Sequence, residues 1–260
     1  MIVRIDRRDF LRLTGAGLAG LTLSVRSTAA DGDTQMNVYV SIAADGGVSV
    51  FAPLADMGQG IYTTLPMIIA EEMDLDWQRV RLRLAPTDKA FGNPARDEQY
   101  AAESKSVRGY FLELRRLGAT ARAMLISAAA DRWGVDAASC ETTPGTDLHP
   151  FSGRRLGYGE LAGDAATLSV PDDVALKPVS EFRLLGKAPP RRDVTPKSLG
   201  QERYGIDLRR PGMRYAAIRH VPVLGARIVD FKLPAGVDAD LVFTLGEDAL
   251  VAVADNTWAA

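Results

Sequence analysis

Apolar and polar residues alternate in two short stretches near the start of the chain, 37–42 and 48–51, and a glycine-containing turn lies between them. Period-two alternation on both sides of such a turn predicts a β-hairpin. Residues 65–73 then repeat their apolar positions with helical spacing, and residues 80–84 return to alternation. The pattern therefore predicts two strands, a helix and a further strand, with a glycine loop just before the helix.

The longest predicted element is a helix over residues 106–133, because its apolar residues recur on one stripe while its arginines lie elsewhere. Gly134 follows at the position where a helix commonly stops. Residues 136–180 are polar and interrupted by prolines and glycines, apart from a short helical stretch at 158–166. We expect this region to be connection more than core.

A compositional break lies at 186–193, where two prolines and four charged residues follow a glycine, as in a linker. Short strand-like runs separated by turns come after it and predict the start of a second domain. There is no internal repeat and no low-complexity segment. The predicted strands of the second domain are 213–220, 227–231, 241–243 and 249–254.

Composition places the chain in the ordinary globular class, with 47% hydrophobic and 25% charged residues among 260. A single cysteine, Cys140, and two histidines, His149 and His220, leave almost nothing for a zinc site or an iron–sulfur cluster. Any metal is therefore expected to arrive inside an organic cofactor. The formal net charge of −2 does not suggest a nucleic-acid partner.

The first 29 residues have the layout of a twin-arginine export signal. Arg7-Arg8 precedes Phe10-Leu11, an apolar stretch follows at 13–25, and small residues come after it. The apolar stretch is too short to cross a bilayer, so we expect a cleaved signal, no membrane span and a periplasmic protein. The alternative is an amphipathic first helix with a chance arginine pair. Twin-arginine passengers are often loaded with cofactor before export, which favours a redox cofactor without naming one.

The chemistry expected first is ligand binding at Gly58-Gln59-Gly60, because glycines let a ligand approach closely and the Gln59 amide can donate and accept. The loop opens a helix, whose N-terminus suits an anion. A plain strand-to-helix turn is the alternative. Ser104 and Ser106 stand at the start of the long helix, where simple capping is favoured over anion binding.

Other polar residues are expected to be structural. Glu71 and Glu72 are neighbours on a helix and point about 100° apart, so we predict a solvated edge with one partly buried member. His149 and His220 are interpreted as structural residues. Cys140 has no histidine in a recognisable relation and is not proposed as a nucleophile.

Several motifs, in one consistent order, resemble the large cofactor-binding subunit of molybdenum hydroxylases of the xanthine dehydrogenase/aldehyde oxidase type. The likeness is to the isoquinoline 1-oxidoreductase beta-subunit group, and it spans the signal and nearly all of the remaining chain. The motifs are Gly58-Gln59-Gly60 with Thr63-Thr64, Ile69-Ala70-Glu71-Glu72, Pro86-Thr87-Asp88, Ser104-Lys105-Ser106-Val107-Arg108, 156–162, 182–187, 204–207 and 211–213.

The resemblance implies an α+β fold: a mixed α/β molybdopterin-binding subdomain followed by the beginning of an α/β hammerhead domain. We expect the N-terminal part of the molybdopterin-binding domain at 35–180, a linker at 181–199 and the truncated start of the hammerhead domain at 200–260.

The resemblance also implies hydroxylation of an N-heterocycle or aldehyde with water. Electrons would leave through a separate small subunit with two iron–sulfur clusters, and a cytochrome is a candidate acceptor. The cofactor would be a molybdenum-pyranopterin cytosine dinucleotide. Gly58, Gln59 and Gly60 would contact it, with Ser104 and Ser106 as further candidates, and no protein residue would bind the metal.

Two departures from the family pattern limit this expectation. Ala102-Glu103 stands where the family usually has Gly-Gly, and a carboxylate beside an anionic cofactor is unfavourable unless it is paired or points away. The family's catalytic glutamate, in a Gly-Val-Gly-Glu stretch near the C-terminus, has no counterpart here, and Glu160 falls in a different motif. We therefore assign no catalytic residue.

The chain is accordingly expected to be a portion of a larger enzyme, inactive without the C-terminal remainder of the large subunit. Two alternatives stay open. One is an exported cofactor-binding or assembly module that kept the fold and lost the chemistry. The other is a degraded gene product that does not fold stably.

Overall fold

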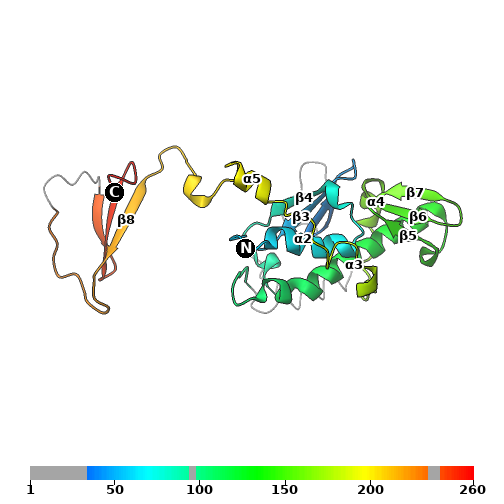
Figure 1. Cartoon of the computed structure of the whole chain (residues 1–260), viewed down its shortest axis with the longest axis horizontal. Coiled ribbons are helices and arrows are strands. Elements are labelled where there is room, and N and C mark those ends of the chain that lie inside the picture. The colour runs from blue at the N-terminus through cyan, green and yellow to red at the C-terminus, as the bar shows by residue number, and fades with distance from the viewer. Residues whose placement is uncertain (1–33, 94–97, 234–240) are drawn as a thin grey trace. The chain divides into compact units, whose positions relative to one another are not determined.

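The computed structural model describes residues 34–93, 98–233 and 241–260 (Figure 1). The chain divides into two compact units, Met1–Ser198 and Leu199–Ala260, called the first and the second unit below. The expected export signal, 1–29, lies outside the described residues. Within the described ranges, no helix is both long and apolar enough to cross a membrane.

The first unit contains a four-stranded sheet, in the order β1-β2-β3-β4. The antiparallel β2–β3 hairpin and the parallel pairing of β3 with β4 confirm three predicted strands, while β1 was not predicted. Parallel neighbours need a crossover connection, and helix α2 provides it. The bounds are β1 Thr34–Asn37, β2 Val40–Ile42, β3 Val48–Ala52, α2 Ile61–Glu72 and β4 Val80–Leu84.

The long helix α3, Lys105–Trp133, confirms the predicted helix and ends at Gly134, which has a φ of 64°. It packs closely on α2 because Gly118 has no side chain: a Cβ there would lie 2.8 Å from the carbonyl oxygen of Ile69. The helices and the sheet enclose one hydrophobic core. Its fully buried members include Val40, Val50, Leu65, Ile68, Ile69, Leu114 and Leu125.

The region 136–180 is not mere connection, and that prediction is wrong. Three short antiparallel strands form a second sheet, in the order β5-β6-β7, and helix α4 follows as predicted. Strands of three or four residues are too short to show a hydrophobic period, which is why the sequence pattern did not reveal them. The bounds are β5 Glu141–Thr143, β6 Thr146–His149, β7 Arg154–Gly157 and α4 Tyr158–Ala165.

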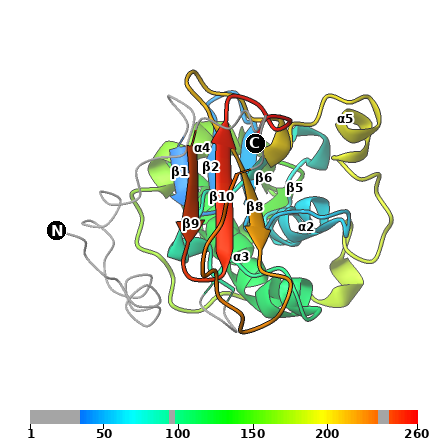
Figure 2. The same cartoon turned by 90° about the vertical axis from the view of Figure 1, so that its left-hand side faces the viewer.

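The second unit contains a sheet in which β10 lies between β8 and β9 (Figure 2). The predicted strand at 227–231 is wrong: that segment is irregular, and among the described residues its one backbone–backbone bond runs from Ile228 N–H to the oxygen of Glu247. The other three predicted strands are confirmed as β8 Tyr215–His220, β9 Leu241–Leu245 and β10 Ala249–Ala254.

Short helical turns complete the described elements: η2 Trp77–Arg79, η3 Lys89–Phe91, η4 Ala137–Ser139, η5 Val179–Glu181, α5 Val194–Ser198 and η6 Gly205–Asp207. The described elements include helices and several sheets, which confirms the predicted α+β class. The assignment of residues 200–260 to a hammerhead domain stays a prediction.

Candidate functional site

Three of the five residues singled out from the sequence as cofactor contacts meet at one pocket in the first unit, whereas Gly58 and Gly60 are not among the residues that line it. The pocket has a volume of about 340 Å³, and Gln59 from the glycine loop lines it together with Ser104 and Ser106 from the start of α3. These residues are more than forty positions apart in the sequence, so only the tertiary fold brings them together. Met57, Ala101 and Ala102, which the sequence reasoning did not select, also line it.

The glycine loop needs its glycines for backbone conformation. Gly58 has a φ of 106° and Gly60 a φ of 87°, and residues with a side chain rarely adopt such values. The side chain of Gln59 braces the loop: its Oε1 accepts from Met57 N–H at 2.5 Å, and its Nε2 donates to the oxygen of Ala55 at 3.3 Å. Hydrogen bonds from its own side chain therefore help to hold the loop in this conformation.

The N-terminus of α2 is not a free anion site, in contrast to our expectation. The carboxylate of Asp56 accepts from Gly58 N–H at 2.7 Å and from Tyr62 N–H at 3.0 Å. Burial acts to raise the pKa of Asp56, but these two N–H groups and the charge of Lys197 lower it overall. An ionised side chain of the protein thus already occupies this helix end.

Ser104 and Ser106 do not act as simple caps. Ser104 is the N-cap residue of α3, yet its φ of 53° is left-handed and its hydroxyl makes no capping bond. Neither serine hydroxyl bonds to another residue in the part of the chain that the structure describes, whereas both residues line the pocket. Both hydroxyls can therefore donate to and accept from a ligand there.

Glu103 does not place an unpaired carboxylate at this turn. Its Oε2 is 2.5 Å from Lys105 Nζ, and Glu103 is not among the residues that line the pocket. Its φ of 56° is left-handed, which explains physically why a glycine suits this position. The pairing removes much of the electrostatic objection to an anionic ligand.

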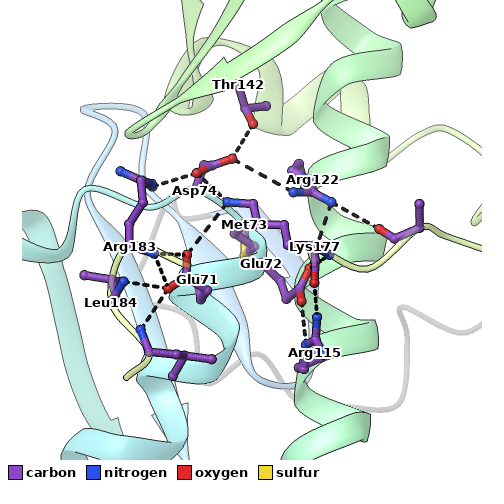
Figure 3. A network of polar contacts seen from close by, with 12 residues as sticks. Glu71, Glu72, Met73, Asp74, Arg115, Arg122, Thr142, Lys177, Arg183 and Leu184 are labelled. Carbon is purple, nitrogen blue, oxygen red and sulfur yellow. Dashed lines mark hydrogen bonds and ion pairs between the residues drawn. The ribbon is translucent and has the colours of Figure 1, made fainter. Parts of the chain in front are cut away.

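A buried acidic cluster, consisting of Glu71, Glu72 and Asp74, lies at the far end of α2 (Figure 3). The prediction that Glu71 and Glu72 form a solvated edge is wrong, since both are fully buried. Glu71 accepts backbone N–H groups from three successive residues: Arg183, Leu184 and Leu185. It therefore fastens the segment after residue 180 to the helix.

The other two carboxylates bind cationic side chains. Glu72 accepts from Arg115 Nε at 2.6 Å and from Lys177 N–H at 3.1 Å. Asp74 accepts from Lys177 Nζ at 2.5 Å and from Arg183 at 2.6 Å. Burial opposes ionisation of Asp74, but Lys177, Thr142 and Arg183 lower its pKa. With its carboxylates engaged in this way, the cluster is structural.

One buried carboxylate stands apart from these pairs. Asp147 on β6 is fully buried, and neither of its carboxylate oxygens has a hydrogen-bond partner among the described residues. Burial, with a smaller contribution from the charge of Asp74, raises its pKa from 3.8 to about 7. Sequence reasoning missed it, because a lone aspartate in a polar stretch is ordinary.

The remaining candidates keep structural roles. His149 is buried, and its Nδ1 lies 2.7 Å from the hydroxyl of Ser152. Burial raises the pKa of the Cys140 thiol, which makes it a poor nucleophile. Across the described ranges, no three His, Cys, Asp or Glu residues form a group that could hold a metal ion.

The first unit is an α+β domain in which Gln59 of the glycine loop and the two serines at the start of α3 line one pocket. Residues 4–198 match the family described as the molybdopterin cofactor-binding domain, and the chain belongs to this family. It is 38% identical to the beta subunit of isoquinoline 1-oxidoreductase from Brevundimonas diminuta, in an alignment that covers 86% of this chain and 34% of that protein.

Two further relatives carry related names. A nicotinate dehydrogenase subunit from Pseudomonas putida is 30% identical over 86% of this chain and 19% of its own length. A membrane-bound aldehyde dehydrogenase (pyrroloquinoline-quinone) from Gluconacetobacter polyoxogenes is 32% identical over 76% of this chain and 25% of its own length. The chain thus spans about a third or less of the curated relatives that it matches.

Proposed function

We propose that this chain forms one wall of the cofactor site of an exported molybdenum hydroxylase. The cofactor would be a molybdenum-pyranopterin cytosine dinucleotide, and the substrates N-heterocycles or aldehydes. The observation that carries the proposal is the pocket in which Gln59 lies together with Ser104 and Ser106, within the region that matches the family.

The residues present fit such a group. A pterin carries several hydrogen-bond donors and acceptors, and its dinucleotide carries phosphates. The hydroxyls of Ser104 and Ser106 stand at the start of a 29-residue helix, where the helix dipole favours an anion. Glu103, the carboxylate nearest in sequence, is paired with Lys105. When bound, the cofactor would supply the metal centre that transfers oxygen and accepts electrons.

The role of the chain's own residues is binding and orientation. Gly58 and Gly60 give the loop the conformation that lets a ligand approach its backbone, and the serine hydroxyls would hold polar groups of the ligand. No residue here is assigned to proton removal, so the complete reaction requires further protein. We propose that this comprises the rest of the large subunit and a small subunit with two iron–sulfur clusters.

The proposed location is the periplasm, reached by the twin-arginine route. The paired arginines and the short apolar stretch of residues 1–29 support it, as does a cofactor that would be inserted before export. A cytochrome is the proposed terminal electron acceptor.

The cofactor role is tested by blocking the pocket. The chain is purified from cells that make the cofactor, and its bound molybdenum and pterin are measured for the unaltered protein, for Ala102→Trp and for Ala138→Trp. Ala102 lines the pocket, whereas Ala138 is an exposed alanine in η4. The proposal predicts bound pterin in the unaltered chain and in Ala138→Trp, and a loss of about tenfold or more in Ala102→Trp.

Equal pterin in both variants would place the cofactor elsewhere. A monodisperse chain that never contains pterin would instead support a module that kept the fold without the cofactor.

A further inference from the structure

A second group of charged residues contacts the glycine loop and has no role in the function proposed so far. It consists of Asp56, Arg191, Asp193 and Lys197, called the loop clamp below. Three of the four come from the segment 181–199, which we expected to be a linker. In the structure, hydrogen bonds and ion pairs hold this segment to the rest of the first unit.

Arg191 joins the segment to the loop directly. Its Nη1 donates to the carbonyl oxygen of Gly58 at 2.8 Å. Its Nε and Nη2 donate to the two carboxylate oxygens of Asp193, at 3.0 and 2.6 Å. The bidentate pair with Asp193 therefore holds the guanidinium in one orientation, and in this orientation Nη1 donates to the loop.

Asp56 completes the connection from the loop side. Its carboxylate accepts the Gly58 and Tyr62 N–H groups described above, and it lies 3.6 Å from Arg191 and 3.5 Å from Lys197. Lys197 also binds Asp193 at 2.6 Å. The N–H and the C=O of Gly58 are thus both fixed, one by Asp56 and the other by Arg191.

Fixing the Gly58 carbonyl also fixes its neighbour. The peptide bond is planar and trans, so the N–H of Gln59 must point opposite to the carbonyl that Arg191 holds. Gly60 also lies next to this guanidinium: a Cβ added at Gly60 would be 3.7 Å from it. The conformation of all three loop residues is therefore linked to the position of one side chain.

The ion pairs of the loop clamp favour the charged form of its residues. The carboxylates of Asp56 and Asp193 are nearly buried, with side chains 6% and 3% exposed. Hydrogen bonds from Arg191 and Lys197 hold the pKa of Asp193 well below its usual value, and Asp193 in turn raises the pKa of both cations. Two acidic and two basic residues leave the clamp close to neutral, so it does not serve to attract an anion.

We propose that Arg191 is a positioning residue, which sets the conformation of Gly58-Gln59-Gly60 for cofactor binding without touching the cofactor itself. This inference rests on the proposed function, because it assumes that the cofactor binds at the loop. The hydrogen bond between Arg191 and the loop does not depend on that assumption. It also assigns a role to the charged stretch just before the boundary between the two units.

The neighbouring residue offers a matched control. The side chain of Arg192 donates to the backbone oxygens of Trp77 and Val80, at 3.0 and 2.9 Å. It anchors the same segment to the same unit, but among the described residues none of its hydrogen bonds goes to the glycine loop. Arg191→Gln and Arg192→Gln therefore remove the same charge one residue apart, with different consequences for the loop.

The test is amide hydrogen exchange of the full chain, read at Gly58 and Tyr62, with pterin content measured on the same preparations. We expect Arg191→Gln to speed exchange at these two amides by about tenfold and to lower bound pterin several-fold, because a charged hydrogen bond to the loop is lost. Arg191→Lys should restore part of the protection, since one donor can still reach the loop. Arg192→Gln should leave both amides unchanged.

Unchanged exchange in Arg191→Gln, or an equal increase in Arg192→Gln, would overturn the proposal. Faster exchange in Arg191→Gln in a chain that binds no pterin in any form would keep the positioning role and remove the cofactor function instead. Circular dichroism of the helices shows that each variant is folded before exchange is read.

Discussion

The two units of the chain bury their apolar residues to very different extents. In the first unit, sheet residues and both long helices enclose a core with many fully buried side chains. In the described part of the second unit, only Ala249, Val251 and Ala254 are buried, and all three lie on the central strand β10. Ile218 and Leu241 are 54% and 55% exposed.

This difference shows where the stability of the site comes from. The pocket, the acidic cluster and the loop clamp all belong to the first unit, whose core can hold them in place. Among its described residues, the second unit has a sheet without an α-helix of its own packed on it, and a three-stranded sheet gains stability chiefly when one face is covered. Matched substitutions in the two units should therefore differ strongly.

The largest difference is expected for a buried carboxylate. Glu72→Gln removes a charge that is fully buried next to Arg115, whose side chain is only 12% exposed, so an uncompensated cation remains. We expect a loss of about 3 kcal/mol or more in the free energy of unfolding. Denaturant unfolding followed by the helical circular dichroism signal measures it.

Glu247→Gln is the matched change in the second unit. Glu247 pairs with Arg227 at 3.0 Å, but their side chains are 70% and 72% exposed. Solvent screens such a pair, so this variant should unfold like the unaltered chain. Equal losses in the two variants would contradict the contrast between the units.

The next largest difference is expected for leucine. Leu125→Ala empties space in the core, where Leu125 is completely buried, and should cost about 2–5 kcal/mol. Leu245→Ala trims a side chain that is 49% exposed in β9 and should cost well under 1 kcal/mol. Thermal unfolding of both variants measures the difference. A large loss of stability in Leu245→Ala would show that this face of the sheet in the second unit is covered by other residues.

How far the sequence predicts this molecule depends on the length of each signal. Helix α3 and the β2–β3 hairpin were predicted because their hydrophobic periods extend over enough residues to be recognised. The strands β5 to β7 are too short for that. Glu71 and Glu72 were misjudged because their partners, such as Arg115 and Arg183, lie some 40 to 110 positions away in the sequence.

The candidate site was predicted in pieces. The residues of the glycine loop and the two serines were identified from their motifs, but nothing in the sequence shows that Gln59 and both serines share one pocket. Arg191 was overlooked because proline and charge are typical of a linker. Its bond to Gly58 depends on the folded position of a residue 133 places away.

A smaller effect, with a defined pH dependence, is expected at Asp147. Its pKa in the folded protein is about 7, above the ordinary value of 3.8. Between these values the unfolded chain is ionised while the folded protein keeps the proton. The contribution of this residue to stability therefore falls as the pH rises from about 4 to about 7, and then stays constant.

Asp147→Asn cannot ionise, so the variant does not lose stability in this way as the pH rises. The variant should match the unaltered chain near pH 4 and be more stable by about 1–3 kcal/mol at pH 8. Urea unfolding at several pH values measures the difference. A difference that does not change with pH would mean that Asp147 is ionised in the fold.

We propose above all that the pocket formed by the glycine loop and the start of α3 holds the pterin cofactor. The most direct test of this proposal is the rate at which maleimide labels Ser104→Cys, compared with Ser180→Cys, a position that is exposed in the same unit and outside the pocket. Native Cys140 is buried and should give little background. With cofactor bound, labelling of Ser104→Cys should slow about tenfold or more while that of Ser180→Cys stays the same. Equal rates at Ser104→Cys with and without cofactor would contradict the account.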